Sequence, residues 1–432
     1  MSSEIQPAPD HFSERDMMST DHVAPMKTPA RKGLAFGVVL TAAALTMAAC
    51  GSSSSGTGGG GEYVIGVQID QSGISRSVGV PQLNGTKAAI DGVNRRGGVN
   101  GKKIKLVVRD DASDAARAVS VYRELTGQYQ VSAIAGYIGS VSIPPAAPLA
   151  AKDKTALLVT GAPSTLLDPP SPAVFSTIGN LNAQGRAGLD YVKRAVENGT
   201  LPKDPRVALL YYASPAGEVW AKEVKSYASK RGLNIVAAQN STVGAASLSS
   251  QMQAITAAKP DAVVAFDIEA DITNAAKAGK AAGLPSDTTI VNYSFGSSPS
   301  ALKAVTDQGY SNYVASANFD VPGGTNQAGA VKQFEEDAKA NKLDSNTVML
   351  AEGYAQGLLI ANVLERCGKS CPAPKFLKTL EDTQTDLDGF AFGEMAYSAA
   401  NHQGVSAVRF RQWDAAKNSF KYAGDPIKLV FN

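Results

Sequence analysis

The sequence contains very little histidine, and this shortage excludes the commonest form of serine catalysis. Its 432 residues include three histidines, and only His402 follows the apolar segment at 34–50. A nucleophilic serine needs a neighbouring base, and His402 stands in a polar stretch that we expect to be a turn. We therefore expect no enzyme; the remaining enzymatic alternative is a hydrolase with Asp267 and Glu269 as paired carboxylates.

Motifs for metals, cofactors and nucleic acids are missing as well. No His/Cys/Asp cluster has the spacing of a metal site. The first expected strand, "YVIGVQI", is followed by "DQSGISRSVG" instead of the G-x-G-x-x-G of a dinucleotide site. The formal net charge is only +2, which gives no basic surface for nucleic acid. We expect no metal, no cofactor and no nucleic-acid partner.

The first 61 residues are expected to lie outside the fold. "MKTPARKG" is positively charged, and "LAFGVVLTAAALTMAAC" is apolar and ends in small residues, which is typical of a secretory signal. Residues 1–49 form this signal region, with Met26 as a possible true start. Residues 50–61, rich in glycine and serine, are expected to be a flexible tether.

Small residues directly before Cys50 resemble a bacterial lipoprotein signal. The resemblance implies cleavage before Cys50, a lipid on its thiol, and anchoring to the outer face of the bacterial cytoplasmic membrane. The alternative is a buried cysteine in an apolar helix. Cys367 and Cys371, in "ERCGKSCP", are expected to form a disulfide that fixes a helix end, because an exported chain meets an oxidising compartment.

From residue 62 onward, apolar strands alternate with amphipathic helices, and 44% of the chain is hydrophobic. Expected strands include "KIKLVVRDD", "SAIAG", "RVALLYY" and "AVVAFD"; Ser113 is expected to cap the helix after "KIKLVVRDD". Strands buried on both faces and alternating with helices predict parallel sheets. The rhythm restarts after residue 180, so we predict an α/β fold with two doubly wound lobes. The final segments predict antiparallel strands.

The succession "NGTKAAIDGVNRRGGVNGKKIKLVVRDDASDAARAV", "IAGYIGSVS" and "LLVTGAPSTLL", with the late "NHQG", resembles type I periplasmic solute-binding proteins of the leucine/isoleucine/valine-binding branch. The resemblance implies three crossovers, near 178–184, 315–320 and 386–390. Lobe I would comprise 62–180 and 318–387, and lobe II 181–317 and 388–432. It also implies a monomer that captures a small molecule for an ABC permease. A receptor for a sensor system is the alternative.

Candidate binding residues of lobe I follow two expected strands, where open α/β sheets bind ligands. The resemblance assigns Ser140 to a ligand carboxylate; Ser142 is a second candidate or a helix cap. In "TGAPSTL", the backbone carbonyl of Ala162 and the hydroxyl of Ser164 match positions that hold an α-amino group.

In lobe II the sequence departs from the family. Ala216 replaces an aromatic residue, and Ser294 stands where an acidic residue often pairs with the ligand's ammonium. Asp267, or else Glu269, would then supply the charge; alternatively the ligand is an aromatic or aliphatic acid without an ammonium. Tyr137, Tyr212 and Tyr293 also end strands, and they either line the cleft or pack in the core.

Overall fold

The computed structural model describes residues 61–137, 139–325, 327 and 329–431, without the side chains of residues 137, 139 and 140. The expected signal, the tether and Cys50 lie outside these residues. Within the described part of the chain, no helix combines the length and the apolar composition that crossing a membrane requires.

The first sheet holds five parallel strands in the order β2-β1-β3-β4-β5. Its strands are β1 (Tyr63–Ile69), β2 (Ile104–Asp110), β3 (Ala133–Tyr137), β4 (Ala156–Val159) and β5 (Val174–Ser176). The helices between them are α1 (Arg76–Arg95), α2 (Ala115–Gly127) and α3 (Gly139–Asp153). Three later helices join this sheet through contacts with α1, β3 and β4: α9 (Gly329–Ala340), α10 (Val348–Cys367) and α11 (Ala373–Glu381).

The second sheet has the order β14-β13-β10-β9-β8-β6-β7. Five strands are parallel: β6 (Arg206–Tyr212), β7 (Asn234–Ser241), β8 (Ala262–Phe266), β9 (Thr289–Asn292) and β10 (Tyr313–Ala317). The antiparallel strands β13 (Ala407–Asp414), β14 (Ser419–Tyr422) and β15 (Ile427–Lys428) complete it. Its helices are α4 (Leu181–Glu197), α5 (Pro215–Lys230), α6 (Ser249–Ala257), α7 (Glu269–Ala282) and α8 (Pro299–Asp307).

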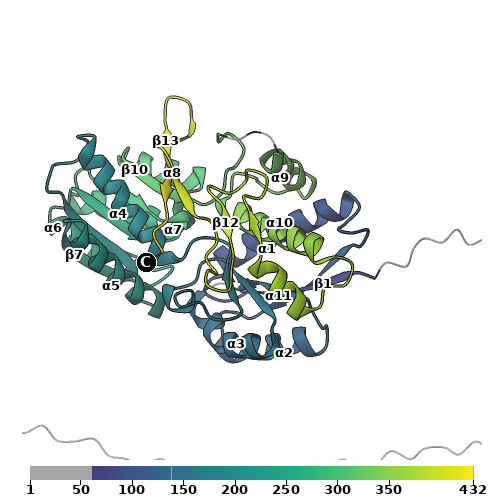
Figure 1. Ribbon diagram of the computed structural model, residues 1–432. Coiled ribbons are helices and arrows are strands. Elements are labelled where there is room, and N and C mark those ends of the chain that lie inside the picture. Colours follow the sequence, from purple (N-terminus) through teal and green to yellow (C-terminus); the bar gives the residue numbers. More distant parts are fainter. Residues whose placement is uncertain (1–60, 138, 326, 328, 432) are drawn as a thin grey trace, which may run out of the picture. The chain divides into compact units, whose positions relative to one another are not determined.

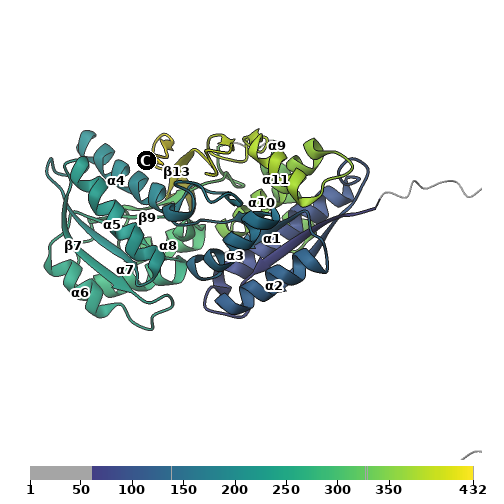
Figure 2. The same cartoon turned by 60° about the horizontal axis from the view of Figure 1, so that its bottom comes forward.

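Figures 1 and 2 show α4–α7 gathered around the second sheet and α1–α3 with α10 and α11 around the first. The central parallel strands β1, β4, β6, β8, β9 and β10 are almost entirely buried, because helices cover both faces of each sheet. The edge strands β2 and β7 are only partly buried. The predicted α/β fold with two doubly wound parallel sheets is confirmed, as is the antiparallel hairpin near the C-terminus.

The chain passes between the sheets through segments that lie side by side. Near residue 180 it runs from β5 into α4, and near 320 it leaves β10 for α9. The return segment pairs with the second of these: the Phe392 N–H donates to the Asn318 carbonyl at 2.9 Å, and the Asp320 N–H to the Phe390 carbonyl at 2.8 Å.

Residues 395–403 contact the first sheet. The Tyr397 hydroxyl donates to the Ser176 carbonyl at 2.8 Å, and Gln403 Nε2 to the Leu167 carbonyl at 3.2 Å. His402 was expected in a polar turn; it is 1% exposed and stacks on Phe175 with ring centroids 3.7 Å apart. Burial lowers the pKa of His402, so this ring is a neutral packing element.

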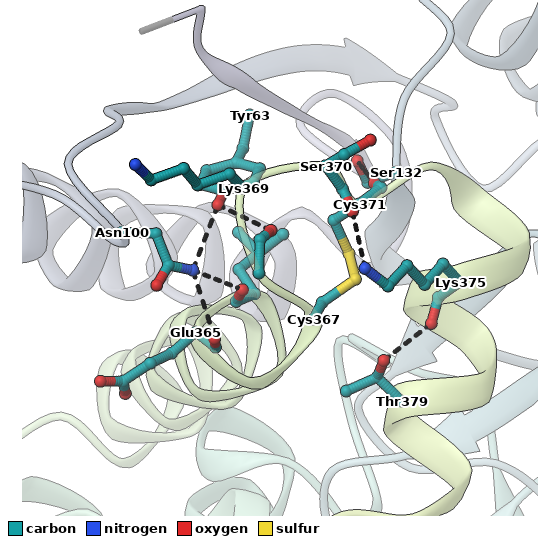
Figure 3. The surroundings of a disulfide bond; sticks show 12 residues. Tyr63, Asn100, Ser132, Glu365, Cys367, Lys369, Ser370, Cys371, Lys375 and Thr379 are labelled. Carbon is teal, nitrogen blue, oxygen red and sulfur yellow. Dashed lines mark hydrogen bonds between the residues drawn. A yellow bond between two sulfur atoms is a disulfide. The ribbon is translucent and has the colours of Figure 1, made fainter.

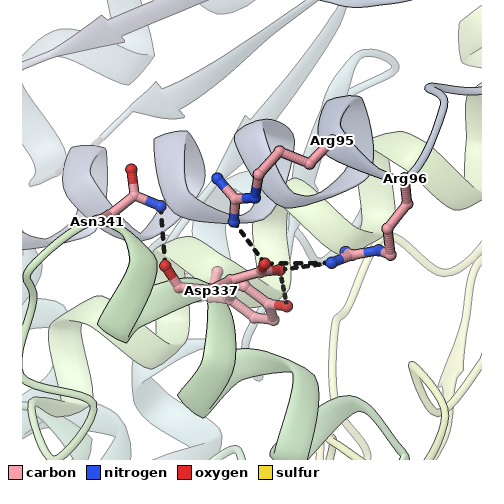
Figure 4. A network of polar contacts seen from close by, with 5 residues as sticks. Arg95, Arg96, Asp337 and Asn341 are labelled. Atoms are coloured by element: carbon pink, nitrogen blue, oxygen red, sulfur yellow. Dashed lines mark hydrogen bonds and ion pairs between the residues drawn. The ribbon is translucent and has the colours of Figure 1, made fainter.

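A buried carboxylate joins α9 to α1 and α10 (Figure 4). Asp337 forms ion pairs with Arg95 at 2.7 Å and Arg96 at 3.1 Å, and it accepts a hydrogen bond from the Tyr354 hydroxyl at 2.9 Å. A Cβ on Gly92 would lie 2.0 Å from the Asp337 carboxylate. The close packing of these helices therefore depends on a glycine at position 92.

The Cys367–Cys371 disulfide forms at the end of α10, as the sequence predicted (Figure 3). Backbone carbonyls around it accept hydrogen bonds from first-sheet residues: Gly368 from the Tyr63 hydroxyl at 2.9 Å and Cys371 from the Ser132 hydroxyl at 2.6 Å. The loop thus ties the helix end to the beginning of β1.

We expect replacement of both cysteines by serine to lower the free energy of unfolding by about 2 kcal/mol, since the closed loop is short. Ligand affinity should stay within about twofold, because the disulfide contacts no residue of the cavity described below. Chemical denaturation and a binding titration on the same preparation measure both. A loss of affinity without a loss of stability would contradict this purely structural role.

Candidate functional site

A cavity of about 250 Å³ lies between the carboxyl ends of strands from both sheets. Its apolar lining includes Ile74, Val78, Val141, Pro163, Leu181 and Phe266. Hydroxyl groups come from Ser75, Ser77, Ser113, Thr160, Ser214 and Thr242. None of the described lining residues is Asp, Glu, Lys, Arg or His. A larger hollow of about 660 Å³ runs along β7 and α5, but only residues of β7, α5 and the loop between them line it.

Aromatic rings form the wall contributed by the second sheet. Phe266 ends β8, and its ring centroid lies 4.6 Å from that of Tyr293, which in turn lies 4.9 Å from that of Phe295. Tyr212 packs edge-on to Phe266 at 5.7 Å, and all four residues line the cavity. Behind them, the fully buried Trp220 stacks on Phe266. The core of the second sheet thus continues into the cavity as a rigid apolar surface.

The Tyr212 hydroxyl does not donate into the cavity, because its hydrogen already goes to another residue and its oxygen accepts a further hydrogen bond. It donates to Asp271 Oδ2 at 2.9 Å and accepts from the Ile268 N–H at 2.7 Å. Burial raises the pKa of Tyr212 well above its ordinary value. Tyr212 and Tyr293 therefore contribute rings, and Tyr212 contributes no donor to a ligand.

Two lobe I candidates, Ser140 of the predicted anion site and Tyr137, have side chains outside the described residues. Ser140 is the second residue of α3, and Tyr137 ends β3. Ser142 does not cap the helix, since α3 begins at Gly139. It is 1% exposed, inside the first turns of the helix.

The other two first-sheet candidates have partners in the second sheet's elements instead of facing the cavity. The Ala162 carbonyl accepts from the Leu181 N–H at 3.3 Å. The Ser164 hydroxyl donates to Glu223 of α5, whose other oxygen forms a 2.7 Å ion pair with Arg186. Their neighbours Gly161 and Pro163 line the cavity. Ser164 thus makes a contact across the cleft.

Asp267 is buried behind the aromatic wall. Its neighbours Phe266 and Ile268 line the cavity, whereas Asp267 itself does not and is 0% exposed. Asn292 holds its backbone from both sides, donating to the Asp267 carbonyl at 2.9 Å and accepting from its N–H at 3.2 Å. Neither carboxylate oxygen has a hydrogen-bond partner among the described residues. Burial, with the nearby Asp271, raises the pKa of Asp267 to about 8.

The remaining second-sheet candidates do not supply a charge to the cavity either. Ser294 is fully buried, and its N–H donates to Gln184 Oε1 at 3.3 Å. Both oxygens of Glu269 accept hydrogen bonds, from the hydroxyls of Ser298 and Ser300, each at 2.6 Å. Ala216, at the start of α5, does line the cavity, and its small side chain leaves room there.

Three lining residues that matter for the polar side of the cavity were not predicted: Thr160, Ser75 and Ser113. Thr160 directly follows β4, a strand-end position that the sequence pattern reveals. Ser113 was expected to cap α2, but Asp114 does so, accepting from the Arg117 N–H at 2.7 Å. Ser113 instead has a φ of +54°, a left-handed conformation that sequence periodicity does not indicate.

The rim of the cavity carries exposed apolar side chains. Ile74 is 62% exposed and Val141 45% exposed, and these are the exposed large hydrophobic residues within the described part of the chain. Both line the cavity. Exposed apolar surface gathered at one hollow is typical of a place where a ligand or a closing surface covers it.

Among the described residues, no acidic, histidine or cysteine cluster suits a metal ion.

Comparisons with known proteins identify relatives of the same architecture. The Leu/Ile/Val/Thr-binding protein of Salmonella typhimurium strain LT2 is 24% identical over 76% of this chain and 89% of its own length. A branched chain amino acid ABC transporter structure from Thermus thermophilus with bound valine superposes with a TM-score of 0.76 at 17% identity, covering 86% of this chain and 97% of that one.

A second solved structure, a solute binding protein of an ABC transporter from Rhodopseudomonas palustris BisB5 in complex with 3,4-dihydroxy benzoic acid, superposes with a TM-score of 0.71 at 20% identity. It covers 85% of this chain and 98% of that one. The model of the family described as periplasmic binding protein matches residues 62–418, which is nearly all of the two-sheet region. The chain therefore belongs to the periplasmic binding protein family.

Proposed function

We propose that this protein is the exported substrate-binding component of an ABC importer and that it captures a small solute in the 250 Å³ cavity. The observation that supports this proposal is the position and lining of the cavity. Strand ends of both sheets meet there, and its walls are mainly apolar. Sites for drug-sized ligands span about 300–1,000 Å³, so this one suits a compact molecule.

The two sheets with their helices act as the two lobes in this proposal, and the segments near 180, 320 and 390 are the hinge. Contacts across the cleft support a closed arrangement: Ser164 of the first sheet's loop donates to Glu223 of α5. On opening, this contact breaks, and a solute can enter past Ile74 and Val141, which are exposed at the rim. The lipid on Cys50 anchors the protein beside its permease, and the monomer is the working form.

The apolar lining favours a carboxylic acid without an ammonium group over an amino acid. An ammonium in a closed cavity needs a paired charge, and the described lining supplies none. Ser140 and the first turn of α3 remain our proposed position for a carboxylate. The family fold accommodates both kinds of ligand, since one relative's structure holds valine and another 3,4-dihydroxy benzoic acid.

A thermal-shift screen of the mature protein tests this function. We expect small aromatic and branched aliphatic acids to raise the melting temperature, because a ligand at 100 times its dissociation constant stabilises the fold by about 2.7 kcal/mol. The twenty amino acids should produce smaller shifts. A dominant response to a zwitterionic amino acid would contradict the choice of ligand, and catalytic turnover of a hit would contradict the binding function itself.

A further inference from the structure

A buried carboxyl group near the start of α10 has partners on both sides of the chain's crossing between the sheets. Glu352 is 1% exposed. Gln82 Nε2 of α1 donates to its Oε2 at 3.0 Å, and Asn318 Nδ2 donates to its Oε1 at 3.2 Å. Helix α1 packs on the first sheet, whereas Asn318 directly follows β10 of the second sheet. One carboxyl group therefore joins the first lobe to a crossover segment.

The same carboxyl is connected to both walls of the cavity. On the first-sheet side, Gln82 Oε1 accepts a hydrogen bond from the Thr160 hydroxyl at 2.7 Å, and Thr160 lines the cavity. On the second-sheet side, α10 contacts the short helix η2 (Ser294–Gly296), whose Phe295 lines the cavity. A movement of one lobe relative to the other therefore changes the surroundings of Glu352.

A small hollow lies between Glu352 and a buried cation. Arg411 of β13 is 0% exposed and borders this hollow together with Glu352, Asn318 and Phe319. Arg411 Nη2 donates to the Phe319 carbonyl at 2.8 Å. Arg411 Nε, Arg411 Nη1 and Asn318 Oδ1 have no hydrogen-bond partner among the described residues. Buried polar atoms without partners are unusual in native proteins, and they point to a second state in which water or a carboxylate satisfies them.

The groups around Glu352 favour its protonated form in this arrangement. Burial raises the pKa of Glu352 to about 7, although hydrogen bonds from Asn318 and Gln82 and the charge of Arg411 lower it. Tyr293, next to η2, stays neutral because burial holds its pKa well above the ordinary value. Helix α1, the crossover and η2 thus present uncharged groups to the carboxyl, and β13 presents the positive charge of Arg411.

Opening of the lobes changes this balance. The arrangement described here is closed, and both lobes enclose the Glu352 side chain. Separation of η2 and β13 from α10 admits water to the hollow. Water and the charge of Arg411 then stabilise a carboxylate, which burial had disfavoured. The open lobes therefore favour the ionised carboxyl, and the closed lobes favour the protonated one.

We infer that Glu352 is a positioning residue whose protonation is coupled to closure of the lobes, so that capture of a solute takes up a proton at this carboxyl. The inference rests on the proposed solute-capture function, and it adds a dependence on pH. Because the closed form holds the proton more tightly, raising the pH favours the open form and release of the solute.

Calorimetric titrations with 4-methylpentanoate and with benzoate at pH 6.0 and pH 8.5 test this coupling. We expect the affinity to fall about tenfold over this range, because the pKa of Glu352 is about 7 in the closed protein and about 4.3 for a glutamate in water. The dependence of the binding heat on the ionisation enthalpy of the buffer counts the protons. About one proton should be taken up at pH 6.0 and almost none at pH 8.5.

Two variants that each remove one buried carboxyl assign the effect. Glu352→Gln cannot ionise, so its affinity for both probes should stay within about twofold across this pH range. Asp267→Asn is the matched control: the backbone partner of Asp267 is Asn292 of the same sheet, so closure leaves its burial unchanged and the tenfold dependence should persist. Thermal unfolding shows whether each variant is folded, and proton counting on the wild type tests the coupling even where Glu352→Gln fails to fold.

Small-angle X-ray scattering without added solute tests the lobes directly. The radius of gyration of the wild type should be larger at pH 8.5 than at pH 6.0, and that of Glu352→Gln should not change. A wild-type affinity that is independent of pH, or an equal pH dependence in Glu352→Gln, overturns the coupling and leaves solute capture intact. If neither probe binds, the proposed ligand class is wrong, and a radius of gyration that does not change with pH then overturns the coupling as well.

Discussion

Replacing Ala216 by tryptophan is expected to abolish ligand binding while leaving the protein folded. Ala216 stands at the start of α5, lines the cavity and has room in front of it. A tryptophan in place of this methyl group would project a bulky indole ring into the 250 Å³ space and block it. We expect affinity for the best ligand of the screen to fall about 100-fold or more, equivalent to about 2.7 kcal/mol.

The matched control is Ala281→Trp, which places the same side chain on the exposed surface of α7. Calorimetry should give wild-type affinity for this variant, and both variants should unfold cooperatively in a thermal scan. Retained affinity in Ala216→Trp would show that the solute binds elsewhere, and the assignment of the cavity would then be wrong.

The second large effect concerns the buried Asp267. Burial raises the pKa of its carboxyl to about 8, against about 3.9 in an unfolded chain. At a pH between these two pKa values, the folded protein retains a proton that the unfolded chain has released. The free energy of unfolding therefore falls as the pH rises through this range. The stabilisation is complete below about pH 4 and is lost as the pH approaches and passes 8.

Asp267→Asn removes this proton exchange with a side chain of the same shape. Between pH 5 and pH 9, the free energy of unfolding of the variant should fall by roughly 2–4 kcal/mol less than that of the wild type. Glu352, whose pKa burial raises to about 7, acts in the same direction in both proteins, so some pH dependence remains. Urea unfolding at a series of pH values measures the difference.

Asp267→Asn also distinguishes a ligand without an ammonium group from a ligand whose ammonium pairs with Asp267. If Asp267 stays behind the aromatic wall, Asp267→Asn should bind the ligand with nearly unchanged affinity. If the side chain instead moved into the cavity to pair with an ammonium, affinity would fall by a large factor, and the preference for an acid without an ammonium would be contradicted.

The fold followed from the sequence because its signals are local. Buried strands such as "RVALLYY" and "AVVAFD" are continuous apolar runs, and the helices between them repeat their apolar residues every three or four positions. These patterns set the element order and hence the two parallel sheets. The positions of Tyr212 and Tyr293 at strand ends likewise placed both residues at the cavity.

The parts of the site that escaped prediction depend on contacts between distant segments. Asp267 follows a strand as expected, but Asn292 holds its backbone and the residue does not line the cavity. Ser164 has a suitable position, yet its hydroxyl pairs with Glu223, 59 residues away. The hydroxyls of Thr160 and Ser113 donate to Gln82 and Asp70, partners that periodicity does not reveal.

The central claim is that an acid with an apolar body binds between the two sheets, against the aromatic wall. A crystal structure with the best-binding acid tests it most directly. We predict ligand density among Thr160, Ala216, Phe266 and Tyr293, with Asp267 still buried. A ligand bound outside this cavity, or an ammonium paired with Asp267, would contradict the account.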